Sequence, residues 1–308
     1  MEDSGIESVS GGVNPKATQP IKTDMQLIAY VNGNFLPLDE ATIHIEDRGF
    51  QFADGVYEVI ACLGGNFLDL RPHLERLNHS CREIDIDLPC SIVDLEALVH
   101  QIYLKNQLDD AMIYIQVTRG RAPRSHVIDP SMQPSLILTL RALPEPSDEK
   151  VEHGATAITL RDFRWGRCDI KSIALLASVM GKQQAVSRGV DEAFWLDDEG
   201  HALEGCATNL FAVIDGQLIT HPLDHHVLGG IMREMILRQA KASDMTVVER
   251  PWKLNEAGIS ECMMSSTTNA LLPVCQIDGK AIGNGSPGPV AHQLRQLVLN
   301  ELEALRNQ

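Results

Sequence analysis

The chain has 308 residues, enough for about two domains with a buried core each, at the ~150 residues that a domain typically needs. Hydrophobic residues make up 44% and charged residues 22%, as in water-soluble globular proteins, and no apolar run approaches the ~20 residues of a membrane-spanning helix. With 42 acidic and 26 basic residues, the net charge is −16, which repels nucleic acid and acidic membranes. We therefore expect neither of them as a partner.

The start of the chain and the cysteines bear on the cellular compartment. Residues 1–26 are rich in Ser, Gly, Asn and Pro and lack an apolar segment, so we expect a flexible N-terminal tail rather than a secretory signal. The seven cysteines include no Cys-x-x-Cys pair, and an odd number cannot all be paired within one chain. Both observations favour a reducing compartment, and we expect the cytoplasm.

The first half of the chain is predicted to form hairpins and helices. Asn32-Gly33 and Gly64-Gly65 each lie between two apolar runs, a pattern typical of tight hairpin turns because these residues tolerate positive φ. A helix is expected after Arg71-Pro72, and Ser91 with Asp94 resembles the capping box of another. The predicted strands are 27–31, 35–38, 56–63, 67–70, 112–118 and 135–140, and the predicted helices are 71–84 and 91–105.

A linker is predicted where two prolines interrupt the pattern. The segment from Pro144 to Asp148 can continue neither a helix nor a central strand. We therefore expect a linker over residues 144–150, between a small domain over 27–143 and a larger cofactor-binding domain over 151–308.

Hairpins also recur in the second half. Asp215-Gly216 and Asp278-Gly279 are predicted turns, and Gly189 is a candidate left-handed helix end. Because hairpins and helices segregate instead of alternating as β-α-β units, the pattern favours an α+β fold over a Rossmann sheet or a TIM barrel. The predicted strands are 155–160, 192–196, 209–214 and 217–220, a hairpin is predicted over 275–282, and the predicted helices are one that ends near 189, 231–242 and 290–306.

Known nucleotide and metal motifs are missing from the sequence. The glycine-rich stretches match neither GxGxxG nor a P-loop, there is no G-x-S-x-G motif, and the histidines and cysteines lack metal-ligand spacing, so we expect no metal. An anion site is nevertheless possible, because Gly229-Gly230 directly precedes a predicted helix and hydroxyl residues at 265–268 follow a predicted strand.

One lysine stands in an unusual context. Lys171 lies between a charged segment, 164–169, and an apolar run, 173–176. Burial favours the neutral form of an amine, and a neutral amine is the nucleophile that Schiff-base chemistry requires. The alternative is that this lysine extends to water, as most lysines beside apolar runs do.

Five motifs follow one another along the chain: Phe52–Val59, His73–Leu77, Asp169–Ser172, Glu204–Phe211 and Ser265–Thr268. Together they resemble the fold-type IV pyridoxal phosphate enzymes, the class IV aminotransferases, from Tyr30 to the C-terminal helix. Within that family, residues 117–126 and 167–172 are most similar to D-amino acid aminotransferases. The resemblance implies an α+β, two-domain fold with the cofactor at the domain interface.

The resemblance implies a role for each cofactor-binding residue. Lys171 would form the internal aldimine with pyridoxal 5'-phosphate and then move a proton between Cα of the substrate and C4′ of the cofactor. Glu204 would face the pyridine nitrogen, and Arg164 would support the surroundings of the ring. Leu228 would pack against the ring, and the phosphate would be held by Arg76, Thr267 and the backbone N–H groups of Ile231 and Met232.

Substrate binding is implied in the same way. Tyr57, Arg124 and His126 match the group that grips the substrate α-carboxylate, with the Arg and the His reaching in from the neighbouring subunit of a homodimer. Thr268 would also lie on the substrate side. The sequence departs from the family pattern at Cys206-Ala207-Thr208, at Ala174 and at Met232, where hydrogen bonds around phosphate and substrate would differ.

The leading hypothesis is ping-pong transamination of D-amino acids with 2-oxo acids. Three alternatives remain: a branched-chain L-amino acid aminotransferase, 4-amino-4-deoxychorismate lyase, and a catalytically silent homologue that only binds the cofactor. Branched-chain enzymes typically carry a tyrosine where this chain has Leu176, which counts against the first of these.

Overall fold

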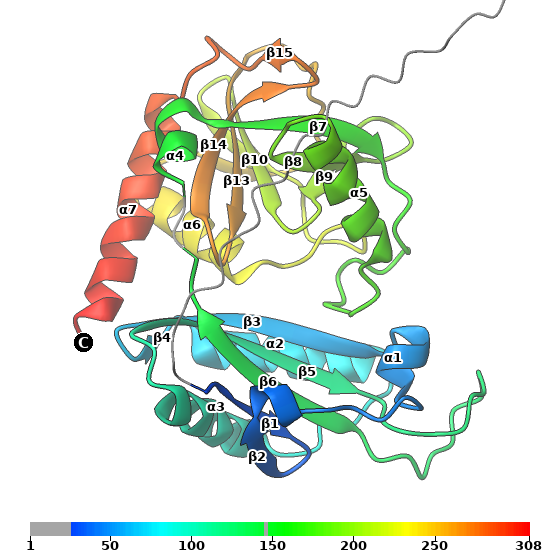
Figure 1. Ribbon diagram of the computed structural model, residues 1–308. Helices are drawn as coiled ribbons and strands as arrows, with labels where there is room; N and C mark the ends of the chain where they lie inside the picture. The colour runs from blue at the N-terminus through cyan, green and yellow to red at the C-terminus, as the bar shows by residue number, and fades with distance from the viewer. Residues whose placement is uncertain (1–25, 145–146) are drawn as a thin grey trace, which may run out of the picture.

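The computed structural model describes residues 26–144 and 147–308 and contains two β-sheets, one above the other in Figure 1. The expected tail lies outside the described residues except for Gln26, as do residues 145 and 146 of the expected linker. None of the helices in the described ranges is long and apolar enough to cross a membrane.

The first sheet is antiparallel throughout, in the order β2-β1-β6-β5-β3-β4. Both predicted hairpins form, and their turn residues have positive φ: 47° at Asn32, 95° at Gly33, 55° at Gly64 and 89° at Gly65. Its strands are β1 (Ile28–Val31), β2 (Asn34–Pro37), β3 (Gly55–Leu63), β4 (Asn66–Phe67), β5 (Asp110–Thr118) and β6 (Ser135–Ala142).

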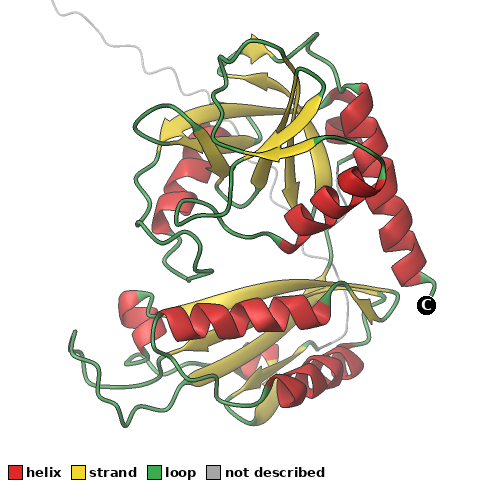
Figure 2. Cartoon of the chain, turned by 180° about the vertical axis from the view of Figure 1, so that it is seen from behind, coloured by secondary structure: helices red, strands yellow, loops and turns green. Residues whose placement is uncertain are grey.

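Two helices cover one face of this sheet, α2 (Leu70–Glu83) and α3 (Ile92–Asn106) (Figure 2). Ser91 caps α3 as predicted, because its Oγ accepts a hydrogen bond from the Asp94 backbone N–H at 3.1 Å. The Asp94 carboxylate accepts from Ser91 Oγ at 2.6 Å and not from the Ser91 N–H, so only half of the capping box forms. The strand predicted over 67–70 is wrong beyond Phe67, since α2 already begins at Leu70. Helices and sheet bury a common core that includes Leu74, Leu77, Leu95, Ile102, Ile113 and Ile115.

The second sheet closes on itself. Strand β9 pairs with both β8 and β10, so β10, β13, β14, β7, β8 and β9 form a ring. Only β7–β8, β7–β14 and β11–β12 are parallel among its described pairings, and the expected α+β class is confirmed. The strands are β7 (Ala155–Arg161), β8 (Glu192–Leu196), β9 (Ala202–Gly205), β10 (Asn209–Ile214), β11 (Gln217–Thr220), β12 (Val247–Glu249), β13 (Ile259–Ser266), β14 (Ala270–Ile277) and β15 (Lys280–Ala281).

Three long helices surround the ring: α5 (Leu176–Ser187), α6 (Ile231–Ala242) and α7 (Pro289–Arg306). Gly189, with φ of 70°, follows α5 as predicted. Helix α7 continues down to the first sheet, where Arg306 Nη2 lies 2.5 Å from Asp110 Oδ2. The core beneath α6 and α7 includes Ala61 and Leu68 from the first sheet and its following turn, so the two halves share apolar contacts.

Strand β13 was expected only as a strand before the hydroxyl residues at 265–268, without bounds, and β14 begins at Ala270 instead of 275. Five short elements were not predicted at all: β9, β12, the 3-10 turn Leu38–Glu40, α1 (Arg48–Phe52) and α4 (Asp148–His153). Each spans six residues or fewer, too short to display the periodicity that identifies a longer helix or strand. Because α4 begins at Asp148, the last three residues of the expected linker are helical.

The segment around Lys171 joins the two halves. It lies beside β3, where the Tyr57 N–H donates to the Lys171 carbonyl at 2.9 Å and the Ile173 N–H donates to the Gly55 carbonyl at 3.0 Å. An isolated β-bridge between Val56 and Ser172 completes this contact. The lysine is thus held against the edge of the first sheet while belonging to the chain between β7 and α5.

Candidate active site

A cavity of about 140 Å³ lies between the two halves. That is about ten times the ~10–15 Å³ that one water molecule needs, so there is room for an organic ligand. The first half contributes Tyr57 from β3 and Arg76 from α2, and the second half contributes most of the wall. The cavity brings together nine of the twelve residues that the sequence singled out: Tyr57, Arg76, Arg164, Lys171, Glu204, Leu228, Ile231, Met232 and Thr267.

Lys171 presents its amine to this cavity. Its backbone is fixed by the contact with β3 and by a hydrogen bond from its N–H to Ser80 Oγ at 3.2 Å. Its Nζ lies 4.4 Å from the centroid of the Tyr57 ring, and the residue is half-buried. The lysine is therefore oriented by an aromatic ring from the other half of the molecule.

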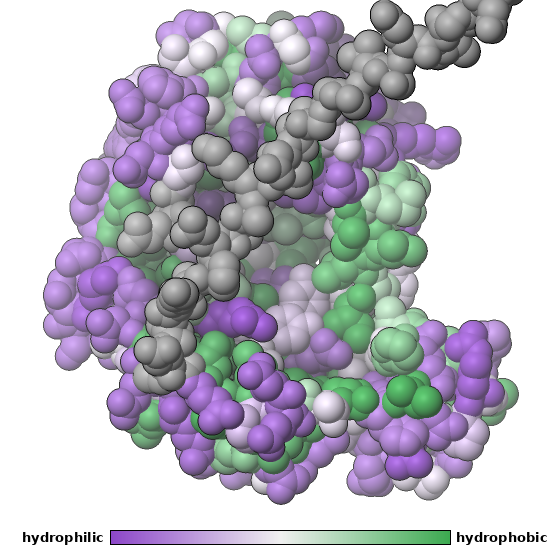
Figure 3. Space-filling model, viewed as in Figure 1, coloured by the Kyte–Doolittle hydropathy of each residue, from purple (hydrophilic) through white to green (hydrophobic). Residues whose placement is uncertain are grey.

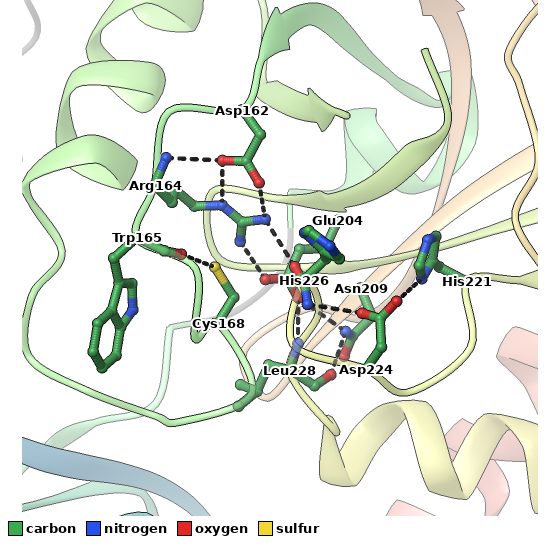
Figure 4. Close-up of polar contacts among 10 residues, drawn as sticks. All are labelled: Asp162, Arg164, Trp165, Cys168, Glu204, Asn209, His221, Asp224, His226 and Leu228. Carbon is green, nitrogen blue, oxygen red and sulfur yellow. Dashed lines mark hydrogen bonds and ion pairs between the residues drawn. The ribbon is translucent and has the colours of Figure 1, made fainter. Parts of the chain in front are cut away.

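Glu204, at the end of β9, is a buried carboxylate with a full set of partners (Figure 4). Arg164 Nη1 donates to Oε1, while the Leu228 N–H donates to Oε2 at 2.9 Å and Asn209 Nδ2 donates to the same oxygen at 3.3 Å. Burial raises the pKa of Glu204, and Arg164 with the Leu228 N–H opposes that effect. These partners fix the direction of the carboxylate within the cavity wall.

Arg164 is in turn held by Asp162. Its Nε and Nη2 donate to the two oxygens of that carboxylate, at 3.0 and 2.8 Å, and Nη2 also donates to the His226 carbonyl at 2.9 Å (Figure 4). This fork geometry leaves Nη1 for Glu204. The structure thus pairs Arg164 directly with Glu204, whereas from the sequence we expected only that it supports the surroundings of the cofactor ring.

The N-terminus of α6 forms an anion seat at another part of the wall. The first N–H groups of a helix have no partner within it, and Gly230 at the N-cap position supplies no side chain to satisfy them. A Cβ on Gly230 would lie 2.0 Å from Asn209 Oδ1, so a larger residue there would displace the Asn209 amide that bonds Glu204 and the Leu228 carbonyl. Ile231, Met232, Ser266 and Thr267 line the cavity at this end.

Arg76 borders the same region and is fixed by a buried glutamate. Its Nε and Nη2 donate to the two oxygens of Glu58 at 2.7 and 2.8 Å, and its Nη1 donates to the Gly229 carbonyl at 2.7 Å. His73 Nδ1 lies 2.7 Å from Glu58 Oε2. Burial disfavours the charged form of Glu58, but Arg76 and His73 outweigh it and lower the pKa of Glu58 to about 2.

Two hydroxyls of the cavity wall are left without partners. Thr208 and Ser265 are 8% and 2% exposed, and the Oγ atom of each is buried without a hydrogen bond among the described residues. Such groups in a native structure call for a ligand or water. An amine, a carboxylate, an anion seat and free hydroxyls in one cavity fit pyridoxal phosphate, which has an aldehyde, a ring nitrogen, a phosphate and a ring hydroxyl.

Three predicted substrate residues do not line this cavity. Arg124 and His126 lie on the exposed loop between β5 and β6, against the ring of Phe52. Thr268 lies in the turn after β13, with its Oγ1 3.3 Å from Ser266 Oγ, and its neighbour Thr267 lines the cavity instead. Among the described residues no group of three or more His, Cys, Asp or Glu could hold a metal ion.

The sequence analysis missed several supporting residues. Glu58, His73 and Asn209 belong to the five motifs, but no role was expected for them; Asn209 bonds both Glu204 and the Leu228 carbonyl. Their position inside the ordered motifs could have indicated a role in the site, whereas their residue type alone could not. Cys206, Ala207, Thr208 and Ala174, where the sequence departs from the family pattern, all line the cavity.

Comparison with known proteins agrees with this geometry. The family model of amino-transferase class IV matches residues 55–277. The chain is 36% identical over 270 residues to a D-alanine aminotransferase of Staphylococcus haemolyticus, covering 87% of this chain and 95% of that one. It is 37% identical over 275 residues to a D-alanine aminotransferase of Listeria monocytogenes, covering 88% of this chain and 95% of the relative.

Solved structures of branched-chain amino acid aminotransferases resemble the chain in shape. The enzyme from T.th., solved with pyridoxamine 5'-phosphate, has a TM-score of 0.86 at 26% identity, covering 92% of this chain and 96% of that chain. The enzyme from Escherichia coli has a TM-score of 0.83 at 26% identity, covering 88% and 93%.

Proposed function

The chain belongs to the class IV aminotransferases, which depend on pyridoxal phosphate, and from this premise we propose that it transfers the amino group of D-amino acids to 2-oxo acids. The observation that carries the proposal is the meeting of Lys171, Glu204 and the α6 anion seat in one cavity. Two half-reactions would alternate: D-alanine gives up its amino group and leaves as pyruvate, and 2-oxoglutarate then receives the group. The D-alanine aminotransferases at 36–37% identity support this choice of substrate.

The cofactor, when bound, supplies an aldehyde for amino groups and a ring that withdraws electrons. Glu204 would hold a proton at the ring nitrogen, since its carboxylate is fixed by Arg164 and the Leu228 N–H. Leu228 would pack against the ring. Arg76, Thr267 and the N–H groups of Ile231 and Met232 would hold the phosphate.

Lys171 would carry the proton chemistry. Its amine would move a proton between Cα of the substrate and the cofactor carbon that carries the amino group, in one direction in the first half-reaction and in the other direction in the second. The Tyr57 ring 4.4 Å from Nζ limits where that amine can point. Which Cα hydrogen faces the lysine then depends on where the substrate carboxylate is anchored.

We propose a homodimer in which that anchor is shared. Tyr57 comes from the same chain, and Arg124 and His126 come from the neighbouring subunit, with Thr268 on the substrate side. Two observations support this: both loop residues are exposed and away from their own cavity, and apolar side chains gather beside the hollow between the two sheets (Figure 3). An exposed apolar patch of this kind is typical of a subunit interface.

Branched-chain L-amino acids are the second candidate substrates. The solved structures of branched-chain amino acid aminotransferases, with TM-scores of 0.83 and 0.86, favour them. Their identity of 26% is lower than the 36–37% of the D-alanine aminotransferases. We therefore keep D-amino acids as the proposed substrates.

We also propose that the protein works in the cytoplasm. All seven cysteines are free, including Cys262 and Cys275 on adjacent strands, which suits a reducing compartment. Fractionation of cells with an antibody to the chain tests this, and recovery outside the cytoplasmic fraction would contradict it.

Substrate handedness is tested by half-reactions of the purified holoenzyme. We expect D-alanine, and not L-alanine or L-leucine, to remove the absorbance of the lysine-bound cofactor, and D-alanine with 2-oxoglutarate to yield pyruvate. Lys171→Ala is expected to abolish turnover, while Lys280→Ala, at an exposed position of β15, leaves it within about twofold. Conversion of L-leucine alone would favour the second candidate, and residual turnover of Lys171→Ala would contradict the role of the lysine.

A further inference from the structure

A short helix that the sequence did not reveal carries an aromatic seat for the exposed loop between β5 and β6. Helix α1 ends with Phe52, whose ring centroid lies 4.5 Å from Cζ of Arg124. The ring of His126 lies 5.3 Å from the same ring, at an interplanar angle of 49°. One side chain of α1 therefore contacts both loop residues that the proposed function assigns to the substrate carboxylate.

From this contact we propose that Phe52 and Arg48 are positioning residues that hold Arg124 and His126 in the orientation needed to grip the substrate carboxylate. The proposal rests on the proposed function and extends it to residues that touch neither substrate nor cofactor. Two further sets of contacts support it.

The first set ties the loop backbone to α1. Arg48, whose side chain is 6% exposed, donates from Nη1 to the carbonyl of Ser125, the residue between Arg124 and His126. Its Nε donates to Asp54 Oδ2 at 2.7 Å, and its Cζ lies 4.8 Å from the Phe52 ring. The buried guanidinium thus links the tip of the loop to the beginning of β3.

The second set fixes α1 against the base of the loop. Oδ2 of Asp47, at the N-cap of α1, accepts hydrogen bonds from Thr118 Oγ1 at 2.9 Å and Ser135 Oγ at 2.8 Å. Thr118 ends β5 and Ser135 begins β6, so one carboxylate joins both ends of the loop. A Cβ on Gly49 would lie 2.4 Å from Thr118 Cγ2, which shows how closely α1 approaches.

Such a seat changes substrate affinity rather than the chemical step. Arg124 is exposed, and a free arginine loses much side-chain freedom when it binds a carboxylate. A ring that already restrains the guanidinium reduces that loss. Arg124 itself remains, so the substrate that binds is still anchored with its Cα facing Lys171, and loss of the seat raises KM and leaves kcat unchanged.

The test compares two phenylalanines of the same helix in the holoenzyme. Phe52→Leu removes the ring but keeps an apolar side chain, and Phe50→Leu is the matched control because Phe50 is 78% exposed, whereas the Phe52 ring carries the contacts with both loop residues. We expect Phe52→Leu to raise KM for D-alanine about tenfold with kcat unchanged, and Phe50→Leu to change neither. In an Arg124→Ala background, Phe52→Leu should add less than about twofold, because the group it positions is gone.

A second measurement does not depend on activity. Hydrogen–deuterium exchange over residues 121–128 should accelerate in Phe52→Leu and not in Phe50→Leu, while exchange of the α2 and α3 amides stays unchanged. Accelerated exchange throughout the first sheet would instead mean a general structural role and would overturn the proposal.

The kinetic outcomes separate this proposal from the proposed function. If Arg124→Ala raises KM and Phe52→Leu does not, the positioning role of Phe52 is wrong, and the proposed binding of the substrate carboxylate by Arg124 stands. If Arg124→Ala leaves KM unchanged, the carboxylate role of the loop is itself wrong, and the positioning role is overturned with it.

Discussion

The Glu58 side chain is fully buried, and its charged carboxylate is paired with two neighbouring side chains. It receives both Arg76 Nε and Nη2 and lies 2.7 Å from His73 Nδ1. A buried ion pair costs desolvation energy, and removing one partner leaves the other charge uncompensated. Because Arg76 is proposed to hold the cofactor phosphate, the buried glutamate determines where that guanidinium stands.

Glu58→Gln is therefore expected to lower the free energy of unfolding by about 3 kcal/mol, since Arg76 keeps its charge without a counterion. We also expect weaker retention of the cofactor on dialysis. Urea unfolding of the apoprotein measures the first effect. The matched control is Glu75→Gln on the same helix, whose pair with Arg71 is exposed to solvent and is expected to contribute little to stability. Equal stability of the two variants would contradict the role of Glu58.

The same pair predicts a pH dependence. The pKa of Glu58 falls from its ordinary 4.5 to about 2 in the folded protein, because Arg76 and His73 outweigh the effect of burial. A lowered folded pKa means stability that is complete above the unfolded value and is lost as pH falls toward the folded one. The stability difference between the wild type and Glu58→Gln should thus be constant above pH ~5 and shrink from pH ~4.5 downward. A difference that grows on acidification would contradict the ionised state of Glu58.

At the scale of elements, the N-terminal end of one helix stabilises the fold, and that of another lines the cavity. Helix α3 begins at the Ser91 cap and contributes no residue to the cavity wall. Helix α6 begins at Gly230 without a side-chain cap, and its first turn lines the cavity. A capped helix end is satisfied internally, whereas an uncapped one at a cavity can bind an anion.

Ser91→Ala is expected to lower the free energy of unfolding by about 1 kcal/mol, because the N-terminal N–H groups of α3 lose their acceptor. Thermal or urea unfolding measures this. Ser91→Thr keeps a hydroxyl and should retain most of the stability, and turnover per active site should be unchanged in both. A loss of turnover in Ser91→Ala would show that α3 influences the cavity after all.

At the scale of the whole molecule, the exposed apolar face of α5 is the main candidate for contact with a second copy. Leu176, Val179 and Val186 are 73%, 61% and 59% exposed, and Ser178 on the same helix lines the cavity. Figure 3 shows apolar atoms gathered beside the hollow on the side where Figure 1 shows α5. A partner placed there would lie next to the mouth of the cavity.

Val179→Asp is therefore expected to weaken the proposed dimer about 100-fold, because a carboxylate would be buried without a partner. Sedimentation velocity across a dilution series measures this, and the matched control is Val93→Asp on α3, where Val93 is 65% exposed. The monomer should also lose activity, since Arg124 and His126 lie outside their own cavity. Equal dimerisation of the two variants would exclude the α5 face from the interface.

Local chemistry made much of this protein predictable. Asn-Gly and Gly-Gly turns, the Ser91 cap and the glycines before α6 act through neighbouring residues, so their effect is visible in the sequence. The order of five motifs identified the family and, with it, nine residues that meet in the cavity. Long elements were found because hydrophobic periodicity needs only about a dozen consecutive residues to appear.

Contacts between distant parts of the chain were decided only by the tertiary structure. The bond from Arg48 to the Ser125 carbonyl joins residues 77 positions apart, and no local pattern encodes such a pairing. The same holds for Glu58 between His73 and Arg76, for the unpaired hydroxyls of Thr208 and Ser265, and for α1, too short to be periodic. Sequence alone thus determined which groups the chain carries and which local turns it makes. Folding determined which of those groups face one another, because burial and long-range packing choose partners that lie far apart along the chain.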